Sequence, residues 1–237
     1  MLHGMMGEPG NWEGLFPHLP ATCHAVALRF PFFSDGVRLD SVEATTEYAR
    51  GYLAGTDHRR IVLCGNSLGG HVALNLALDM PERICGIVLT ASSGLFERSF
   101  GSASPHPPRD WVREKMCEVF YDESHVTKDL VDWVVRIISV RRNARDLVRI
   151  AKSAKRDNVG ERLRNIACPS LLIWGRQDQI TPPDVAEEFR SKLPHCELEW
   201  IEQCGHAPML EHPKLFAEHL CHWWYRHICP QDSPEPG

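Results

Sequence analysis

The sequence predicts an α/β fold, built on a mostly parallel, doubly wound sheet with a helical insertion. Short continuous apolar runs alternate with stretches of helical periodicity, which is the order expected of repeated βαβ units. The clearest unit joins a strand over 60–64, a helix that ends before Pro81 and a strand over 84–90. From Gly94 the pattern changes to helical periodicity without strands, which predicts an insertion between two sheet strands.

Composition excludes several other classes of protein. A length of 237 residues predicts one large domain with an insertion, and 26 basic against 31 acidic residues do not suggest a nucleic-acid partner. No apolar run approaches the roughly 20 residues of a membrane helix, so we expect a soluble protein without a membrane span. The nine cysteines, odd in number and without a C-x-x-C pair, predict reduced thiols, no metal site and a cytoplasmic location.

The chain starts abruptly, because residues 1–2 lead at once into the turn H-G-M-M-G, which normally follows a full buried strand. We therefore expect N-terminal strands to be missing or truncated, since a gap within a parallel sheet leaves backbone groups unsatisfied. The following pattern predicts a short helix over 12–19, a strand over 23–30 and a helix that begins near Asp40 or Ser41 and ends at about Ala54.

The pentapeptide G-N-S-L-G at residues 65–69 has the pattern of a nucleophile elbow. It follows the buried strand over 60–64 and opens a helix, so Ser67 lies at a sharp strand-to-helix turn. Gly65 and Gly69 lack the Cβ atoms that would collide across so tight a bend. The sequence therefore predicts that Ser67 is presented above the edge of the sheet.

The insertion is predicted to span residues 94–166 as a helical lid, between core segments 1–93 and 167–229. Helical periodicity covers 109–120, 128–139 and 143–155, followed by a short return over 162–166. Its basic residues are expected to form a solvated face. They are Arg136, Arg141, Arg142, Arg145, Arg149, Lys152, Lys155 and Arg156. Residues 230–237 are predicted to be a flexible tail.

The remainder completes the sheet, and its loops carry two further polar candidates. It is predicted to hold a strand over 170–174, a helix over 184–193, an edge-side strand over 197–201 and a helix over 213–228. Asp178 follows the first of these strands and His206 the second. Three loops that follow three predicted strands therefore carry Ser67, Asp178 and His206, in that order.

Ser67, Asp178 and His206 together predict nucleophilic catalysis. A serine hydroxyl needs an imidazole to take its proton, and the imidazole needs a carboxylate to fix its tautomer. Asp184 is the nearest alternative acid, but its place after two prolines predicts that it caps a helix. Four further residues near these motifs are expected to have no catalytic role: His3 and His212, which hold loops, and Cys64 and Cys204, which are buried.

The order Ser, Asp, His and the motifs around them resemble the α/β-hydrolase superfamily over nearly the whole chain. The matching motifs are H-G at residues 3–4, G-N-S-L-G at 65–69, G-R-Q-D at 175–178 and G-H at 205–206. The resemblance implies an oxyanion hole formed by the backbone N–H groups of Met5 and Leu68. It also implies catalysis without a cofactor.

Two kinds of hydrolase remain open. The elbow and its helix look like those of carbon–carbon hydrolases of aromatic meta-cleavage pathways, but those enzymes commonly place tryptophan after the histidine, and Ala207 stands here. The same segment suits carboxylesterases, so we favour hydrolysis of small carboxylic esters through an acyl-enzyme at Ser67. In a carbon–carbon hydrolase, Arg98, Arg109 or Arg142 would contact the acidic substrate.

A third hypothesis from another class is a hydrolase-fold ligand receptor or scaffold with little turnover. Either enzyme hypothesis predicts a small-molecule acyl substrate as the partner. The sequence leaves the oligomeric state and the acyl-chain preference open.

Overall fold

Parallel strands form the sheet that carries the candidate site. The computed structural model describes residues 1–96 and 107–229, so Arg98 and the predicted tail over 230–237 lie outside the described residues. Within these residues, four strands follow the order β1-β2-β3-β4, and each neighbouring pair is parallel. They are β1 (Ile61–Asn66), β2 (Ile84–Thr90), β3 (Ser170–Gly175) and β4 (Cys196–Ile201).

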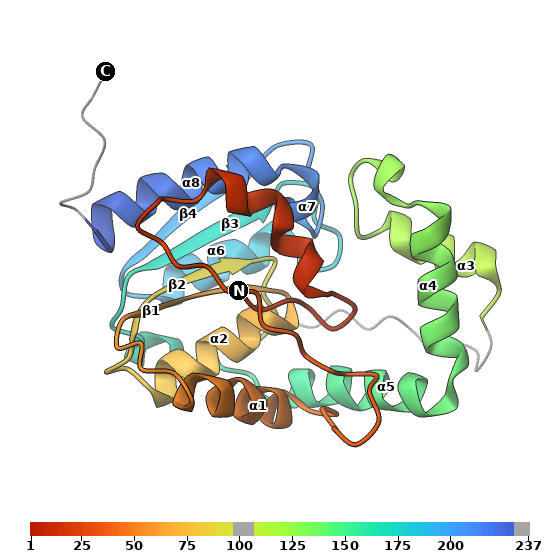
Figure 1. Cartoon of the computed structure of the whole chain (residues 1–237). Coiled ribbons are helices and arrows are strands. Elements are labelled where there is room, and N and C mark those ends of the chain that lie inside the picture. The colour runs from red at the N-terminus through yellow and green to blue at the C-terminus, as the bar shows by residue number, and fades with distance from the viewer. Residues whose placement is uncertain (97–106, 230–237) are drawn as a thin grey trace.

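Helices connect and cover these strands (Figure 1). They are η1 (Pro9–His18), α1 (Val42–Ala54), α2 (Leu68–Asp79), α3 (Arg109–Cys117), η2 (Glu123–His125), α4 (Lys128–Ser139), α5 (Arg141–Arg156), η3 (Leu163–Asn165), α6 (Pro183–Lys192), α7 (Pro208–Glu211) and α8 (Pro213–His227). None of the helices in the described part of the chain is long and apolar enough to cross a bilayer.

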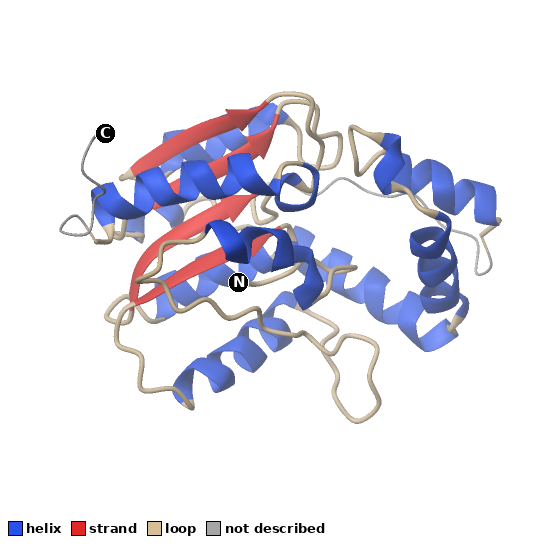
Figure 2. Ribbon diagram, turned by 45° about the horizontal axis from the view of Figure 1, so that its top comes forward, coloured by secondary structure: helices blue, strands red, loops and turns tan. Residues whose placement is uncertain are grey.

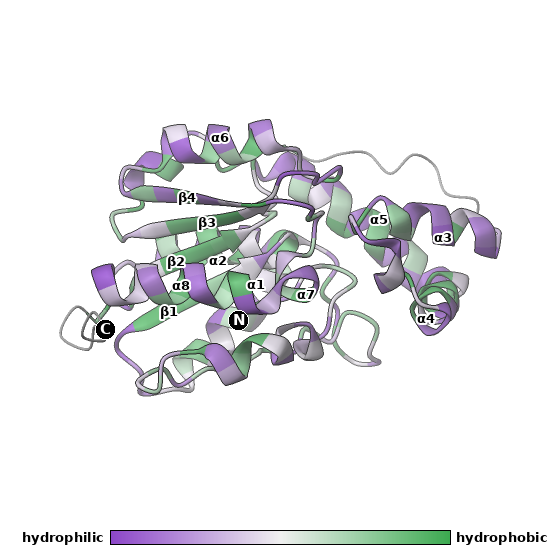
Figure 3. Cartoon of the chain, turned by 90° about the horizontal axis from the view of Figure 1, so that it is seen from above, coloured by the Kyte–Doolittle hydropathy of each residue, from purple (hydrophilic) through white to green (hydrophobic). Residues whose placement is uncertain are grey.

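Alternate residues of the strands pack into two separate apolar cores, one on each face of the sheet. Leu63 and Ile87 face the core that contains α1, α2 and α6, whereas Cys64 and Val88 face the core that contains η1 and α8. Figure 2 shows the strands between these helices, and Figure 3 shows β2 and β3 as predominantly hydrophobic. The predicted α/β fold with helices on both faces of a parallel sheet is therefore confirmed.

Most predicted elements lie where their patterns indicated. Ser41 begins α1, its side chain accepts a hydrogen bond from the Ala44 N–H, and Val42, Thr45 and Ala49 are buried. Strand β4 is at the edge of the described sheet, as its alternating sequence predicted. The periodicity of the insertion likewise corresponds to α3, α4 and α5. In these segments the local pattern was sufficient because it matches the face that tertiary packing buries.

The N-terminal segment differs from prediction in two ways. The strand predicted over 23–30 is wrong: only Leu28 pairs, through a single bridge to Leu2, and most of these residues stay partly or fully exposed. Because Leu2 is the single described residue that pairs with this segment, the segment cannot form the continuous ladder of backbone hydrogen bonds that defines a strand. The helix predicted over 12–19 is instead the 3₁₀ helix η1, which starts earlier because Pro9 suits a first helical position.

The basic face of the insertion contacts the core at two points. Arg142 lies 2.8 Å from the Asp35 carboxylate, and Arg149 lies 3.3 Å from Asp40. The Ser153 hydroxyl also accepts a hydrogen bond of 3.0 Å from the Val42 N–H at the start of α1. The predicted solvated face is confirmed, because Arg142 is partly exposed and the other seven basic residues are exposed. The ion pairs of Arg142 and Arg149 lie at the solvent boundary between α5 and the residues before α1.

Candidate active site

Ser67 occupies a strained turn between β1 and α2. Its φ of 53° and ψ of −120° lie in a region that non-glycine residues seldom adopt. Its carbonyl accepts hydrogen bonds from Gly70, His71 and Ser93 N–H groups, which hold the turn in place. A Cβ on Gly65 would lie 2.3 Å from the Gly69 carbonyl oxygen, so the glycine prediction has a direct steric basis.

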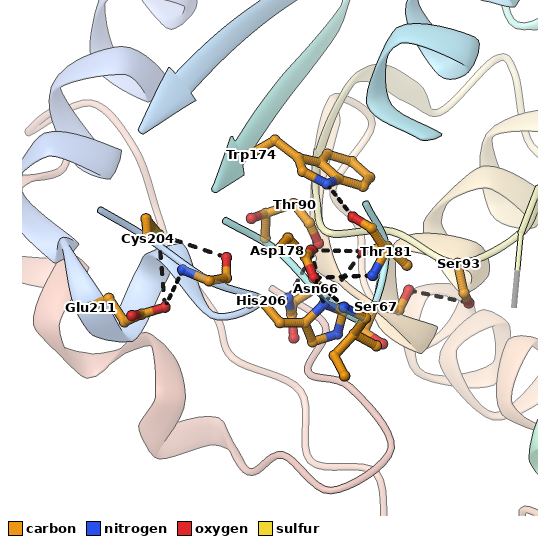
Figure 4. Close-up of polar contacts among 12 residues, drawn as sticks. Asn66, Ser67, Thr90, Ser93, Trp174, Asp178, Thr181, Cys204, His206 and Glu211 are labelled. Carbon is orange, nitrogen blue, oxygen red and sulfur yellow. Dashed lines mark hydrogen bonds and ion pairs between the residues drawn. The ribbon is translucent and has the colours of Figure 1, made fainter. Parts of the chain in front are cut away.

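Asp178 is buried in the loop after β3, and both of its carboxylate oxygens are engaged. Oδ1 accepts hydrogen bonds from the N–H groups of Ile180 at 2.8 Å and Thr181 at 3.0 Å. Oδ2 accepts one from the Thr181 hydroxyl at 2.8 Å. The same oxygens lie 3.2 Å and 3.0 Å from Nδ1 of His206 (Figure 4). The loop therefore directs the carboxylate at one nitrogen of the imidazole.

His206 is buried in the loop after β4, and its backbone is held on both sides. Its N–H donates to the Val119 carbonyl at 2.7 Å, and its carbonyl accepts from the Asn66 side-chain amide at 3.1 Å. Since Nδ1 faces Asp178, Nε2 is the nitrogen left for another partner. Figure 4 shows Ser67 in the same cluster as His206 and Asp178. The structure thus brings together the three residues that the sequence selected.

The residues before Met5 run alongside the elbow. The Leu2 N–H donates to the Cys64 carbonyl at 2.7 Å, and the Leu2 carbonyl accepts from the Asn66 N–H at 3.0 Å. A Cβ on Gly4 would lie 3.2 Å from the Ser67 Cβ. The backbone next to Met5 therefore passes so close to Ser67 that a side chain at position 4 would crowd it. The other candidate donor, Leu68, is the first residue of α2, where backbone N–H groups have no partner within the helix.

His3 holds this N-terminal segment, as predicted. Its Nε2 accepts a hydrogen bond from the Phe30 N–H at 3.0 Å, and its Nδ1 lies 2.8 Å from the Gly4 carbonyl oxygen, so Nδ1 carries the proton. Burial lowers the pKa of His3 and favours the neutral ring that this pair of contacts requires. His212 also has a structural contact, between Nε2 and the Gln203 carbonyl oxygen at 3.0 Å.

The remaining predicted site residues have other partners. Arg109 pairs with Asp132 within the insertion, at 2.8 Å, and Arg142 pairs with Asp35 as described above. Asp184 lies in the first turn of α6 but does not cap it, because Pro182 holds the N-cap position. Its expected capping role was therefore wrong, since helix α6 begins directly after Pro182.

The two cysteines beside the site are unsuited to nucleophilic chemistry. Burial raises the pKa of Cys64 to about 12, and burial is also the main reason that the pKa of Cys204 is raised. A thiol must ionise to act as a nucleophile, so both side chains remain protonated near neutral pH. Both therefore serve as small apolar groups, as the sequence indicated.

Three polar residues near the site were not selected from the sequence. Asn66 donates to the carbonyls of Thr90 and His206, and Thr181 donates to Asp178. Asn66 directly precedes Ser67, and Thr181 lies three residues after Asp178. Their nearness to these motifs could have marked both residues as candidates. The Glu211 carboxylate accepts hydrogen bonds from the N–H groups of Gly205 and of Tyr121 in the insertion. No local sequence pattern indicates these contacts.

A family model described as "Alpha/beta hydrolase family" matches residues 1–219 of the chain. The chain belongs to this family. Pimeloyl-[acyl-carrier protein] methyl ester esterase of Nitrosomonas europaea is 30% identical to this alpha/beta hydrolase, over 92% of the chain and 91% of the esterase. Hydrolase YugF of Bacillus subtilis is 26% identical, over 92% of the chain and 86% of its own length.

A third relative of this alpha/beta hydrolase is the 2-hydroxy-6-oxononadienedioate/2-hydroxy-6-oxononatrienedioate hydrolase of Comamonas testosteroni, 27% identical over 91% of the chain and 83% of the relative. Among solved structures, the alpha/beta hydrolase MGS-MChE2 from a lagoon-sediment metagenome has a TM-score of 0.74 and 32% identity, over 95% of this chain and 89% of that one. The meta-cleavage product hydrolase CumD of Pseudomonas fluorescens has a TM-score of 0.74 at 20% identity, over 94% and 88%, and so shares the fold. Membership of the family is therefore shown by sequence and by structure.

Proposed function

We propose that this alpha/beta hydrolase is a serine hydrolase that cleaves small carboxylic esters through an acyl-enzyme at Ser67. The observation that carries the proposal is the contact of 3.0 Å between His206 Nδ1 and Asp178 Oδ2, beside the strained turn that holds Ser67. A carboxylate there fixes the imidazole tautomer and stabilises the imidazolium that forms during catalysis.

The acylation step uses the nitrogen that Asp178 leaves available. Ser67 Oγ attacks the ester carbonyl carbon while His206 Nε2 takes its proton. The N–H groups of Leu68 and Met5 would stabilise the resulting oxyanion, and the start of α2 adds the positive end of a helix dipole. Collapse breaks the carbonyl–alkoxy bond, and the His206 imidazolium returns its proton to the departing alcohol.

The deacylation step reverses these roles with water. His206 Nε2 takes a proton from water, whose oxygen attacks the acyl carbon of the ester to Ser67. When the acid departs, the imidazolium returns that proton to Ser67 Oγ. No residue changes its oxidation state, and the cycle consumes one water for each ester.

Relatives support the ester as substrate without defining its acyl chain. The esterase of Nitrosomonas europaea, named for a methyl ester, combines 30% identity with coverage of 91% of its own length. Ala207 after the histidine also suits an esterase, as argued from the sequence. Residues 94–166, whose described part contains α3, α4 and α5, act in this proposal as a lid. The nine free thiols fit a reducing, cytoplasmic location.

A carbon–carbon hydrolase is the second candidate. It is favoured by relatives such as the Comamonas testosteroni hydrolase at 27% identity. The same Ser67 and His206 would serve this reaction, but the substrate acid needs a cationic partner. Arg109 and Arg142 already pair with aspartates, which weakens this candidate relative to the esterase.

The first experiment measures hydrolysis of short-chain nitrophenyl esters by the wild type and Ser67→Ala. We expect turnover to fall at least about 10⁴-fold in the variant, because the acyl-enzyme cannot form. Ser191→Ala is the matched control, since within residues 1–96 and 107–229 that exposed hydroxyl donates only to the Glu188 carbonyl. Equal turnover by Ser67→Ala and the wild type would contradict the proposal.

Two further measurements separate the alternatives. Rates on a dienol acid from aromatic ring fission and on an ester of matched size would distinguish the two hydrolases. Labelling by a fluorophosphonate, in which Ser67 Oγ displaces fluoride from phosphorus, tests for an activated nucleophile. A folded wild type that remains unlabelled would favour the receptor or scaffold hypothesis.

A further inference from the structure

The loop that carries His206 is joined to the insertion by direct backbone contacts. We name residues 203–206 the base loop and residues 118–122, between α3 and η2, the insertion linker. The His206 N–H donates to the Val119 carbonyl at 2.7 Å. A Cβ on Gly205 would lie 2.5 Å from the same carbonyl oxygen and 2.9 Å from the Tyr121 nitrogen. The two segments are therefore packed backbone to backbone directly beside the candidate base.

Glu211, the last residue of α7, joins the same two segments through its carboxylate. Oε1 accepts a hydrogen bond of 2.8 Å from the Gly205 N–H (Figure 4). Oε2 accepts bonds from the N–H groups of Tyr121 at 2.7 Å and Asp122 at 3.3 Å. An ionised carboxylate has acceptors on both oxygens and forms stronger hydrogen bonds than a neutral group does. One side chain thus bonds both the base loop and the insertion linker.

We infer that Glu211 is a positioning residue that sets the orientation of His206 by holding the base loop against the insertion linker. This inference rests on the proposed function, in which His206 is the general base. The imidazole is held at Nδ1 by Asp178, and its backbone N–H is held by Val119. Release of the base loop would let Nε2 move relative to Ser67, and a displacement of about 1 Å can reduce catalysis by up to about 100-fold.

Apolar packing offers a competing explanation of the same junction. Phe120 is buried in the insertion linker and stacks on His125, with ring centroids 5.4 Å apart. If that packing alone fixed the linker, Glu211 would contribute only to stability. A decisive test must therefore measure the reactivity of each folded molecule and not the amount of folded protein.

The test is the rate of fluorophosphonate labelling of Ser67 in Glu211→Gln. Glutamine has the same shape, but one oxygen becomes an NH₂ group that faces an N–H donor whichever way the amide turns. We expect the labelling rate constant to fall about tenfold, because labelling also requires the general base. The final extent of labelling, which reports the folded fraction, should match that of the wild type.

Two additional variants complete the design. Glu202→Gln makes the same chemical change immediately before the base loop, where the carboxylate is exposed and pairs with Arg176 at 3.3 Å. Its rate constant should stay within about twofold of the wild type. Gly205→Ala displaces the base loop from the other side, because its Cβ meets the Val119 carbonyl, and it should also slow labelling. If Glu211→Gln does not fold, the labelling rate of Gly205→Ala provides the test in its place.

The outcomes separate this inference from the function on which it rests. Slow labelling of Glu211→Gln to the full extent, with Glu202→Gln unchanged, supports the positioning role. Unchanged rate constants in both Glu211→Gln and Gly205→Ala overturn it, and so does a lower extent of labelling at the wild-type rate constant. An unlabelled wild type overturns the proposed function itself before any variant is compared.

Discussion

The two sides of the candidate site are held by different kinds of interaction. On the nucleophile side, backbone hydrogen bonds and glycine contacts hold Ser67 between β1 and α2. On the base side, the side chains of Asp178, Asn66 and Glu211 hold His206 and its loop. The nucleophile thus depends on local backbone geometry, whereas the base depends on polar side chains from other segments in addition to its backbone contact with Val119.

This difference has a physical reason. A strained turn needs neighbours that leave no room for relaxation, which close backbone packing provides. An imidazole that gains and loses a proton needs oriented acceptors and donors, which carboxylates and amides provide. Substitutions on the nucleophile side should therefore affect folding and activity together, and those on the base side should mainly affect activity.

Among substitutions that keep Ser67, the largest effect is expected on the base side, from Asp178→Asn. The amide no longer fixes the His206 tautomer or stabilises the imidazolium, so kcat on a nitrophenyl ester should fall about 10⁴-fold. Circular dichroism should show a folded protein. A variant with more than a tenth of wild-type kcat would remove Asp178 from the acid role and weaken the contrast between the two sides.

On the nucleophile side, Gly69→Ala should cause the largest loss of stability. The added Cβ would lie 2.1 Å from the Leu2 carbonyl oxygen, and backbone atoms there have little room to move. We expect the free energy of unfolding to fall by about 3 kcal/mol, measured by urea denaturation. Gly51→Ala in α1 is the matched control, because its Cβ meets nothing within 4 Å. That control should gain about 0.5 to 1 kcal/mol from helix propensity.

Asn66→Ala tests the residue that connects the two sides. Its amide donates to the Thr90 carbonyl at 3.2 Å and to the His206 carbonyl at 3.1 Å. Loss of both bonds should lower the free energy of unfolding by about 2 kcal/mol and kcat by about tenfold. In Asn158→Ala, which removes an exposed amide that donates to the Leu95 carbonyl, kcat should not change. Equal kcat values for Asn66→Ala and the wild type would show that the two sides are independent.

The smallest effect concerns a histidine–carboxylate contact on α2, the helix that follows Ser67. His71, on α2, is buried with Nε2 3.1 Å from Asp157 Oδ2. The contact with His71 is the largest of the causes that lower the pKa of Asp157 to about 2. Because the folded pKa lies below the unfolded one, the stabilisation is present above the unfolded value and is lost as pH falls.

Asp157→Asn should therefore lower the free energy of unfolding near pH 7 by about 1 kcal/mol, after allowance for solvent screening of a partly exposed carboxylate. The difference from the wild type should vanish as pH falls from 3.8 to about 2. Urea denaturation over this range provides the measurement. A difference that persists unchanged at the lowest pH would show that packing, and not charge, accounts for the contribution of Asp157.

Local patterns predicted much of the fold and the candidate site. Ser67 was found because G-x-S-x-G follows a buried strand and opens a helix, and Asp178 and His206 because each follows a later strand. The segment 23–30 was misread because an apolar strand pattern does not reveal whether a partner strand lies opposite. Asn66 and Thr181 lay next to recognised motifs, but their roles depend on which acceptors the fold brings near.

Apart from the segment 23–30, the sequence by itself determined the order of strands and helices along the chain, the strained turn at Ser67 and the identity of the candidate acid and base. These features depend on residue spacing and on glycines within a few positions, which the chain carries locally. Only the tertiary structure decided what holds His206. The Asn66 amide reaches it across 140 positions in the sequence, and Glu211 bonds Tyr121 across 90. Such contacts form when distant loops meet at one edge of the sheet, and no local pattern specifies them.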